Sequence, residues 1–464
     1  MQTIDLSLSS QRVAVIGAGI AGLTAAYRLK EAGASVTVFD AQDVVGGRMG
    51  DRRTGDLFYN SGARLVYPFG RAFNRVVADL ALQNALVPLH RLSAQCVSPQ
   101  GEHTIELMPS PRSLATPGLS LAERAKLVAH ALAMRGARRH VDPDWATSAL
   151  QVDSTLDDTT LAAYIRGTLG PNVLARMVEP VFRATRSFNP ETLSALFYVS
   201  TVPHMIGEST VHTLRGGMGR VCQALASRLE VRTATPVRKL RRHADGVELT
   251  LADGSMFSAD HAVCAVEGSL AGALIDAPTR EERQMFDAVR YNALGVVHYG
   301  VSQALPPKMN FAMRGSPGRI ATYQQLPAAP AQGRPLTQIY CQLTPEAADE
   351  AVQQGLEDDL DVLIRDELRA RIPGFDRHVV QVANQWIARK LPVFSPGYGA
   401  RVDAFWRWQE LGMDKAKAET GTQRVAYCGD WLSQALLTGA CASGERAARA
   451  LLGRMQAEPA RLAA

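Results

Sequence analysis

The chain has 464 residues, of which 46% are hydrophobic and 20% are charged, so we expect a globular protein with two or more structural domains. Its net charge of +5 comes mainly from scattered arginines rather than from basic blocks that follow a phosphate backbone, which excludes nucleic acid as an expected partner. Six separated cysteines and ten histidines form no metal-binding spacing, so we expect reduced thiols, no metal ion and a cytoplasmic protein.

The N-terminal segment predicts a nucleotide-binding unit. Residues Arg12–Ile16 have the β-branched composition of a short strand, Leu23–Ala32 that of a helix, and Ser35–Phe39 that of a second strand. Between the first strand and the helix lies the pattern G-x-G-x-x-G, from Gly17 to Gly22. These tight connections are typical of a β-α-β unit in a doubly wound parallel sheet.

Each glycine of this loop has its own expected part in binding a dinucleotide. Gly17 permits the turn, Gly19 admits a pyrophosphate, and Gly22 lets the helix pack closely on the strand. The phosphates then meet unpaired N–H groups at the start of the helix. Asp40 ends the second strand about twenty residues further on, where an acid accepts hydrogen bonds from a ribose diol.

The residues after Asp40 favour FAD over NAD. Gly46 and Gly47 allow a close backbone approach, and the planar guanidinium of Arg48 can neutralise a pyrophosphate. A nicotinamide-dependent dehydrogenase has no need of this second group. The sequence therefore predicts one FAD.

The remainder of the chain predicts a helical insertion followed by a return to the nucleotide-binding part. Residues 121–140 and 157–200 have helical patterns, and residues 304–335 resemble loops and strands of a second layer. Further expected elements are strands at Val247–Leu251 and His261–Ala265, a strand that runs into a turn at Val425–Asp430, and helices at Glu357–Ile372 and Gly439–Leu452. We expect an α/β fold: a discontinuous Rossmann-type FAD-binding domain (residues 1–70, 210–268 and 378–464) with an inserted α+β substrate-binding domain (71–209 and 269–377).

These motifs resemble the flavin-containing amine oxidase superfamily, which also holds protoporphyrinogen oxidase and the phytoene desaturases. Asp40, six intervening residues and then Gly-Gly-Arg match the second FAD motif of that family, with Asp in place of Glu. Tyr59–Arg64 resembles the segment that passes near the flavin ring, although Asn60 stands where an acid or a small residue is usual. Trp386–Val402 resembles the segment behind the flavin, especially as protoporphyrinogen oxidases have it, and Gly429–Ala448 contains a likeness of the closing flavin motif.

The resemblance implies a set of cofactor-binding residues. Asp430 is expected to meet the ribityl chain or pyrophosphate, backbone N–H groups at Leu437 and Thr438 to face the pyrimidine edge, and Val237 to meet the adenine. The complete predicted set is Gly17, Gly19, Ile20, Ala21, Gly22, Asp40, Ala41, Gly47, Arg48, Gly62, Ala63, Arg64, Val237, Gly429, Asp430, Leu437 and Thr438. We assign no catalytic residue; Tyr67, His298, Tyr340, Lys390 and Tyr398 are uncommitted pocket candidates.

Departures from the amine-oxidising branch narrow the expected chemistry. Leu436 and Leu437 stand where those enzymes usually have aromatic residues that surround the amine. No cysteine lies between the Trp386 and Gly429 motifs before Cys428, and Cys441 is expected to be a packing residue, so we expect FAD to be bound non-covalently. The Gly216–Gly219 turn is interpreted as lacking a preceding strand, which argues against a second domain for NADPH.

We therefore expect an FAD-dependent oxidase or dehydrogenase that removes hydride from a fairly apolar small molecule, by C–C or C–N oxidation or desaturation. The expected acceptor is O2 or another acceptor such as a quinone. The alternatives are an amine or amino-acid oxidase, a redox-neutral flavin-dependent isomerase, and a non-catalytic flavin-binding protein. Attachment of the 121–140 helix to a membrane surface is the less favoured interpretation of its basic and apolar residues. The sequence predicts no particular substrate or oligomeric state.

Overall fold

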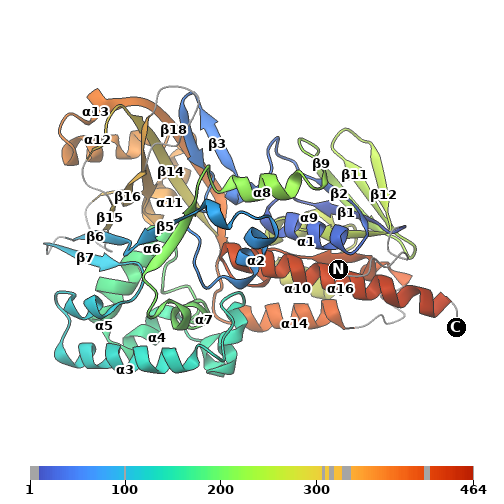
Figure 1. The fold of residues 1–464 in the computed structure, drawn as a ribbon, viewed down its shortest axis with the longest axis horizontal. Helices are drawn as coiled ribbons and strands as arrows, with labels where there is room; N and C mark the ends of the chain where they lie inside the picture. Colours follow the sequence, from blue (N-terminus) through green and yellow to red (C-terminus); the bar gives the residue numbers. More distant parts are fainter. Residues whose placement is uncertain are drawn as a thin grey trace.

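The computed structural model describes residues 10–98, 101–305, 309–312, 318–326, 336–411 and 419–462. Figure 1 shows a nucleotide-binding half, which contains α1 and β1, beside a second half that contains a large sheet and a group of helices. Segments from the beginning, middle and end of the chain contribute to the first half. The expected discontinuous α/β architecture is confirmed.

A five-stranded parallel sheet forms the centre of the nucleotide-binding half. Its spatial order is β19-β13-β1-β2-β9. The bounds are β1 (Arg12–Ile16), β2 (Ser35–Phe39), β9 (Glu230–Arg232), β13 (His261–Cys264) and β19 (Val425–Tyr427). Four consecutive buried residues in each of β1 and β2 fit a parallel sheet that is covered on both faces.

Helices and a small sheet cover this central sheet. Helix α1 (Ile20–Glu31) follows β1 directly and packs on the C-terminal helix α16 (Leu437–Leu462). An antiparallel sheet of β10 (Val237–Arg242), β11 (Val247–Leu251) and β12 (Met256–Ala259) carries Phe257, whose ring meets the ring of Phe39 on β2 edge-on at 4.9 Å. The apolar strand ends are thereby removed from water.

The second half is built on a seven-stranded sheet with the order β18-β14-β17-β16-β15-β6-β7. Its strands are β6 (Ser93–Ser98), β7 (Gly101–Glu106), β14 (Tyr291–Val301), β15 (Met309–Ala312), β16 (Ile320–Leu326), β17 (Thr337–Leu343) and β18 (Val379–Pro392). The predicted domain boundary at residue 378 thus falls where a strand of this sheet begins, and the domain division stays a proposal. Residues 306–308, 313–317 and 327–335 of the predicted second-layer segment lie outside the described residues.

Helices flank the seven-stranded sheet. α11 (Pro345–Gln354) and α12 (Asp361–Arg371) share a hydrophobic core with β14 and β17. The helical insertion contains α3 (Leu121–Ala137), α4 (Leu161–Thr168), α6 (Glu179–Arg186) and α7 (Leu196–Met205). Its core is continuous with the core of the nucleotide-binding half.

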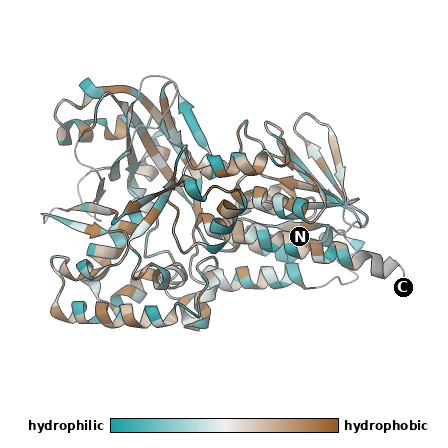
Figure 2. Ribbon diagram, in the orientation of Figure 1, coloured by the Kyte–Doolittle hydropathy of each residue, from teal (hydrophilic) through white to brown (hydrophobic). Residues whose placement is uncertain are grey.

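Helix α3 leaves apolar side chains in solvent. Leu121 and Leu132 are 85% and 68% exposed, and hydrophobic and hydrophilic residues alternate along the helix (Figure 2). None of the helices in the described ranges is long and apolar enough to cross a membrane. Attachment to a membrane surface remains a prediction.

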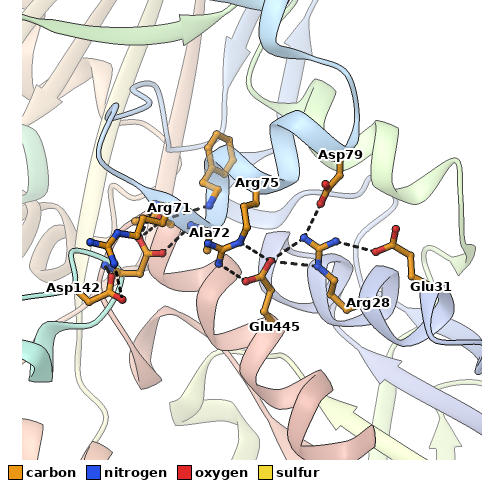
Figure 3. Close-up of polar contacts among 11 residues, drawn as sticks. Arg28, Glu31, Arg71, Ala72, Arg75, Asp79, Asp142 and Glu445 are labelled. Atoms are coloured by element: carbon orange, nitrogen blue, oxygen red, sulfur yellow. Dashed lines mark hydrogen bonds and ion pairs between the residues drawn. The ribbon is translucent and has the colours of Figure 1, made fainter. Parts of the chain in front are cut away.

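A polar network ties α1 and α16 to α2 (Arg71–Asp79), as Figure 3 shows. Arg28 of α1 lies 2.7 Å from Asp79 and 2.9 Å from Glu445 of α16, and it also pairs with Glu31. Arg75 of α2 donates to the other oxygen of Glu445 at 2.6 Å. One carboxylate therefore connects the three helices whose first turns approach the predicted cofactor site.

Candidate active site

A single cavity of about 730 Å³ brings the predicted cofactor-binding residues together. It lies at the carboxyl ends of β1 and β2, where Ile16, Phe39 and Asp40 reach it, and extends to the seven-stranded sheet at Thr322 and Tyr340. Crevices at the carboxyl ends of parallel strands are where open α/β sheets bind ligands. Every residue of the predicted set lines this cavity except Gly22.

The glycine loop has the geometry that a dinucleotide requires. Gly17 has a φ of +107°, which disfavours a side chain, and its N–H donates to the Phe39 carbonyl at 2.7 Å. A Cβ atom at Gly22 would lie 2.0 Å from the Gly17 carbonyl oxygen, so this glycine is needed for helix packing inside the protein. A Cβ at Gly19 would have no protein atom within 4 Å, so Gly19 borders open space at the start of α1.

The second glycine motif lies against the first. The Gly46 N–H donates to the Ala18 carbonyl at 2.9 Å, and an ideal Cβ on Gly47 would lie 3.7 Å from the Gly19 Cα. Gly46 has a φ of +108° and Gly47 one of +51°, which explains why glycine suits both positions. The two loops together form a backbone cradle that fits the pyrophosphate of FAD.

Asp40 is held by backbone N–H groups at the other end of the cradle. Its Oδ2 accepts from Ala18 at 2.6 Å and its Oδ1 from Gln42 at 2.8 Å. Burial raises the pKa of Asp40 above its ordinary value, against the opposing effect of these hydrogen bonds. Ala41 and Val237 also line the cavity, so the residue expected to bind the ribose and the residue expected to meet the adenine border the same space.

Arg48 and Asp430 form a two-pronged ion pair across the cavity. The two terminal nitrogens of Arg48 donate to the two carboxylate oxygens of Asp430 at 2.8 and 2.9 Å. Arg48 also donates to the Lys390 carbonyl at 2.6 Å. Asp430, which we expect near the ribityl chain, thus positions the guanidinium of Arg48, which we expect at the pyrophosphate.

The hydrogen bonds of Asn60 account for an amide side chain at this position, where the family usually has an acid or a small residue. Its Nδ2 donates to the Met49 and Gly50 carbonyls, and its Oδ1 accepts from the Gly62 N–H at 2.7 Å. An acid lacks the donor for the first two contacts. Asn60 therefore shapes the turn that carries Gly62, Ala63 and Arg64 along the cavity wall.

Sequence reasoning missed Asp144, which lies behind the start of α16. Its buried carboxylate accepts from the Thr438 hydroxyl at 2.5 Å and from the Arg71 and Ala72 N–H groups at 3.0 and 2.8 Å. Leu437 and Thr438 line the cavity and begin α16. Asp144 comes from the helical insertion, and no local motif marks an acid that acts across such a sequence separation.

Three of the five uncommitted candidates line the cavity. Tyr67, Tyr340 and Lys390 do so, whereas His298 and Tyr398 do not. His298 hydrogen-bonds with Gln385 and Gln338 behind Tyr340, and burial lowers its pKa to about 4. Tyr398 donates to the Trp431 carbonyl at 2.9 Å. His298 and Tyr398 therefore lie behind the residues that line the cavity and support them.

The interpretation of the Gly216–Gly219 turn was wrong in one respect. A strand, β8 (Thr210–Leu214), does precede it, and α8 (Gly219–Ala226) follows. β8 pairs antiparallel with β5 (Leu86–His90), outside the parallel sheet. The Gly219 N–H donates to Asp51, so an acidic side chain takes the place that a phosphate would need.

Neither a cysteine nor a histidine of the described residues lines the cavity. All six cysteines lie in the described ranges, are buried and are free. Burial raises the pKa of the Cys441 thiol well above its ordinary value. No described cluster of His, Cys, Asp and Glu has an arrangement that could hold a metal ion.

Comparison with known proteins agrees with this geometry. The chain is 25% identical over 190 residues to protoporphyrinogen oxidase 2 of Arabidopsis thaliana, an alignment that covers 40% of this chain and 35% of the relative. It therefore matches only about a third of that relative's length. Putrescine oxidase with bound putrescine has a similar fold (TM-score 0.71, 17% identity, 96% of this chain and 99% of that one). A fatty acid isomerase from P. acnes is also similar (TM-score 0.68, 17% identity, 95% and 99%).

The family model described as flavin containing amine oxidoreductase matches residues 20–452, which is most of the chain. This match confirms the resemblance that the motifs indicated and the expected FAD cofactor, for which the glycine cradle provides a fitting site. The protein belongs to the flavin-containing amine oxidoreductase family.

Proposed function

We propose that this FAD-dependent oxidoreductase removes a hydride from a carbon atom of a fairly apolar small molecule, with O2 or another acceptor such as a quinone reoxidising the flavin. The observation that carries the proposal is the lining of the cavity beyond the nucleotide-binding residues. Leucine and isoleucine side chains form much of its apolar part: Leu92, Leu107, Ile387, Leu391 and Leu436.

Such a lining suits hydride removal because it holds an apolar substrate and excludes water. When bound, FAD supplies the hydride acceptor. Tyr67 and Tyr340 offer polar groups at the cavity wall, and each already has a protein partner. Arg186 donates to the Tyr67 hydroxyl at 3.0 Å, and Tyr340 donates to Gln342 at 3.1 Å. These residues orient a substrate rather than act as strong bases.

The same wall argues against an amine substrate. The guanidinium of Arg64 lies 3.6 Å from the centre of the Tyr340 ring, and that of Arg186 lies 5.8 Å from the Tyr67 ring. Each tyrosine ring therefore already contacts an arginine guanidinium, and these positive charges repel the ammonium group of an amine substrate. Leu436 lines the cavity where an aromatic cage would be expected. We infer that C–C desaturation is favoured over amine oxidation.

Anaerobic reduction of the flavin tests this proposal. Partly reduced cyclic compounds should bleach the visible flavin absorbance, whereas primary amines of similar size should not. Bleaching by amines alone would overturn the proposal in favour of an amine oxidase. Turnover of a cyclic substrate without consumption of any acceptor would overturn net oxidation and indicate an isomerase.

A further inference from the structure

Three basic side chains from three separate segments line the part of the cavity next to the seven-stranded sheet. Arg64 follows β4 (Leu57–Asn60), Arg186 ends α6, and Lys390 lies in β18. Arg186 is 7% exposed. Arg64 and Lys390 are partly buried and line the same cavity. The fold thus concentrates positive charge where the apolar lining predicts the substrate.

Neutral groups hold these three cations in place. Arg64 stacks on Tyr340 and donates to Gln324. Arg186 donates to the hydroxyls of Tyr67 and Thr185, each at 3.0 Å. Lys390 donates to the Ser187 hydroxyl at 3.1 Å and to the Thr185 carbonyl at 3.4 Å. Within the described ranges, none of the ion pairs involves Arg64, Arg186 or Lys390.

The acids that line the cavity have other positions and partners. Asp40 lies at the adenosine end, where backbone N–H groups hold it. Asp430 is occupied by Arg48, and Glu267 lies 4.0 Å from Arg389. The three cations therefore face the cavity without a carboxylate from the described part of the chain. Buried charge of one sign is costly until an opposite charge arrives.

The basic groups also disfavour one another. Burial, together with the positive charges of Arg64 and Arg186, lowers the pKa of Lys390 well below its ordinary value. An anion bound among them would reverse this effect and accept charge-assisted hydrogen bonds from two planar guanidinium groups. Apolar residues Leu92, Leu107 and Ile387 line the same cavity, so the remainder of such a ligand is hydrophobic.

We propose that Arg64, Arg186 and Lys390 bind a carboxylate of the substrate, which makes the substrate class an apolar carboxylic acid. This inference rests on the proposed function for the identity of the cavity as a substrate site. It assigns the three residues a role in substrate recognition. The carboxylate fixes one end of the molecule and the leucine-lined wall holds the rest.

Calorimetric titration of the oxidised holoenzyme tests the charge preference directly. The probes are phenylbutyrate, its neutral primary amide, phenylbutylamine and the corresponding phosphonate. Phenylbutyrate should bind about ten- to a hundredfold more tightly than the amide, as expected for charge-assisted hydrogen bonds, and the amine should bind most weakly. Equal affinity for acid and amide, or tighter binding of the amine, would overturn the proposal. A phosphonate that binds about tenfold more tightly than the acid would overturn the carboxylate assignment.

Variants locate the preference within the cavity. Arg186→Met and Lys390→Met should each reduce the acid-to-amide ratio to near unity while the affinity for the amide is retained. Arg183→Met is the matched control, because Arg183 lies one turn earlier on α6, pairs with Glu346 and does not line the cavity. Its ratio should stay at the wild-type value. FAD content and thermal unfolding are measured for each variant, and the wild-type titration decides the proposal even where a variant fails to fold.

The cofactor provides the competing explanation for the three cations. If they serve FAD, Arg186→Met and Lys390→Met will lose flavin while the remaining holoenzyme keeps the wild-type acid-to-amide ratio, and the proposal is overturned. The titration measures binding without turnover, so its result does not depend on whether the proposed reaction is correct. One outcome would separate the two proposals. If the enzyme binds phenylbutyrate preferentially but only amines bleach its flavin, the proposed hydride removal from a non-amine is overturned and the carboxylate-binding site is still supported.

Discussion

Gly19 and Gly22 belong to one loop, but a side chain would have space at the first position and none at the second. Gly19 has an ordinary φ of −71° and open space beyond its Cα, whereas a Cβ on Gly22 would overlap the Gly17 carbonyl. We predict that Gly19→Ala changes the free energy of unfolding of the apoprotein by less than about 0.5 kcal/mol, yet weakens FAD binding at least about tenfold. Gly22→Ala should lose about 3 kcal/mol of stability as well.

Denaturant unfolding of the two apoproteins and flavin titration provide the measurements. Equal loss of apoprotein stability in both variants would contradict the separation of a packing glycine from a phosphate-facing glycine.

Arg48 and Asp430 act as one unit. Their two hydrogen bonds are charge-assisted, and loss of either residue leaves a charged partner without its counterpart. We expect Arg48→Met and Asp430→Asn each to destabilise the protein and the double variant to cost about 1–3 kcal/mol less than the sum. A double-mutant cycle of unfolding free energies measures this coupling. Additive effects would show that the pair contributes little.

At the scale of single residues, local sequence patterns predicted which residues line the cavity, because each glycine motif reflects a backbone conformation or close approach that is set within a few positions. Their role in binding the nucleotide stays a prediction. Asp144 and Arg186 were missed because their significance comes from contacts across distant segments. Asp144 reaches Thr438, and Arg186 reaches Tyr67. Nothing adjacent to either residue in the sequence signals such a contact.

At the scale of elements, Glu445 links α1, α2 and α16. Burial alone would raise its pKa, but hydrogen bonds from Arg75 and Arg28 outweigh this effect and the pKa is lowered. The carboxylate thus stabilises the fold above pH 4.5, the ordinary pKa of glutamate, and this contribution is lost as the pH falls towards the lowered value. We predict that Glu445→Gln costs about 1–3 kcal/mol at neutral pH and progressively less in acid.

Urea unfolding of the variant at several pH values tests this dependence. Glu31→Gln is the matched control, since Glu31 pairs with the same Arg28 but its side chain is 43% exposed. It should cost about 0.5 kcal/mol or less. A Glu445→Gln effect that is independent of pH would contradict the electrostatic account.

Element boundaries show where periodicity was sufficient and where it failed. β1 and β2 have the predicted bounds because both are short runs rich in β-branched residues, with four consecutive buried positions. Helix α1 begins at Ile20 instead of Leu23, since Gly22 belongs to its first turn and permits close contact with the loop. β8 was not recognised because two of its five residues are buried and its partner β5 lies far away in the sequence. Pairing partners of this kind are not encoded locally.

At the scale of the whole molecule, the cofactor is predicted to be bound without a covalent bond and to stabilise the fold. None of the six cysteines lines the cavity, and all are buried. Precipitation with trichloroacetic acid should leave all the flavin in the supernatant, and flavin in the pellet would contradict this. Free FAD at about a hundredfold its Kd should add about 2.7 kcal/mol to the free energy of unfolding, seen as a rise in Tm with FAD concentration.

The strand order of the parallel sheet also determines when the cofactor can enter. β19 occupies one edge and α16 covers α1, and Asp430 and Thr438 line the cavity although they lie far along the sequence from β1. A nascent chain on the ribosome can form β1, α1 and β2 early, but it lacks this part of the cavity wall until residues 430–438 have been made. The part that folds first therefore has an incomplete and partly apolar cleft while the intervening residues are synthesised. FAD meets its complete site only after the segment around Asp430 and Thr438 has folded, so flavin scarcity would act on a chain that already contains this segment.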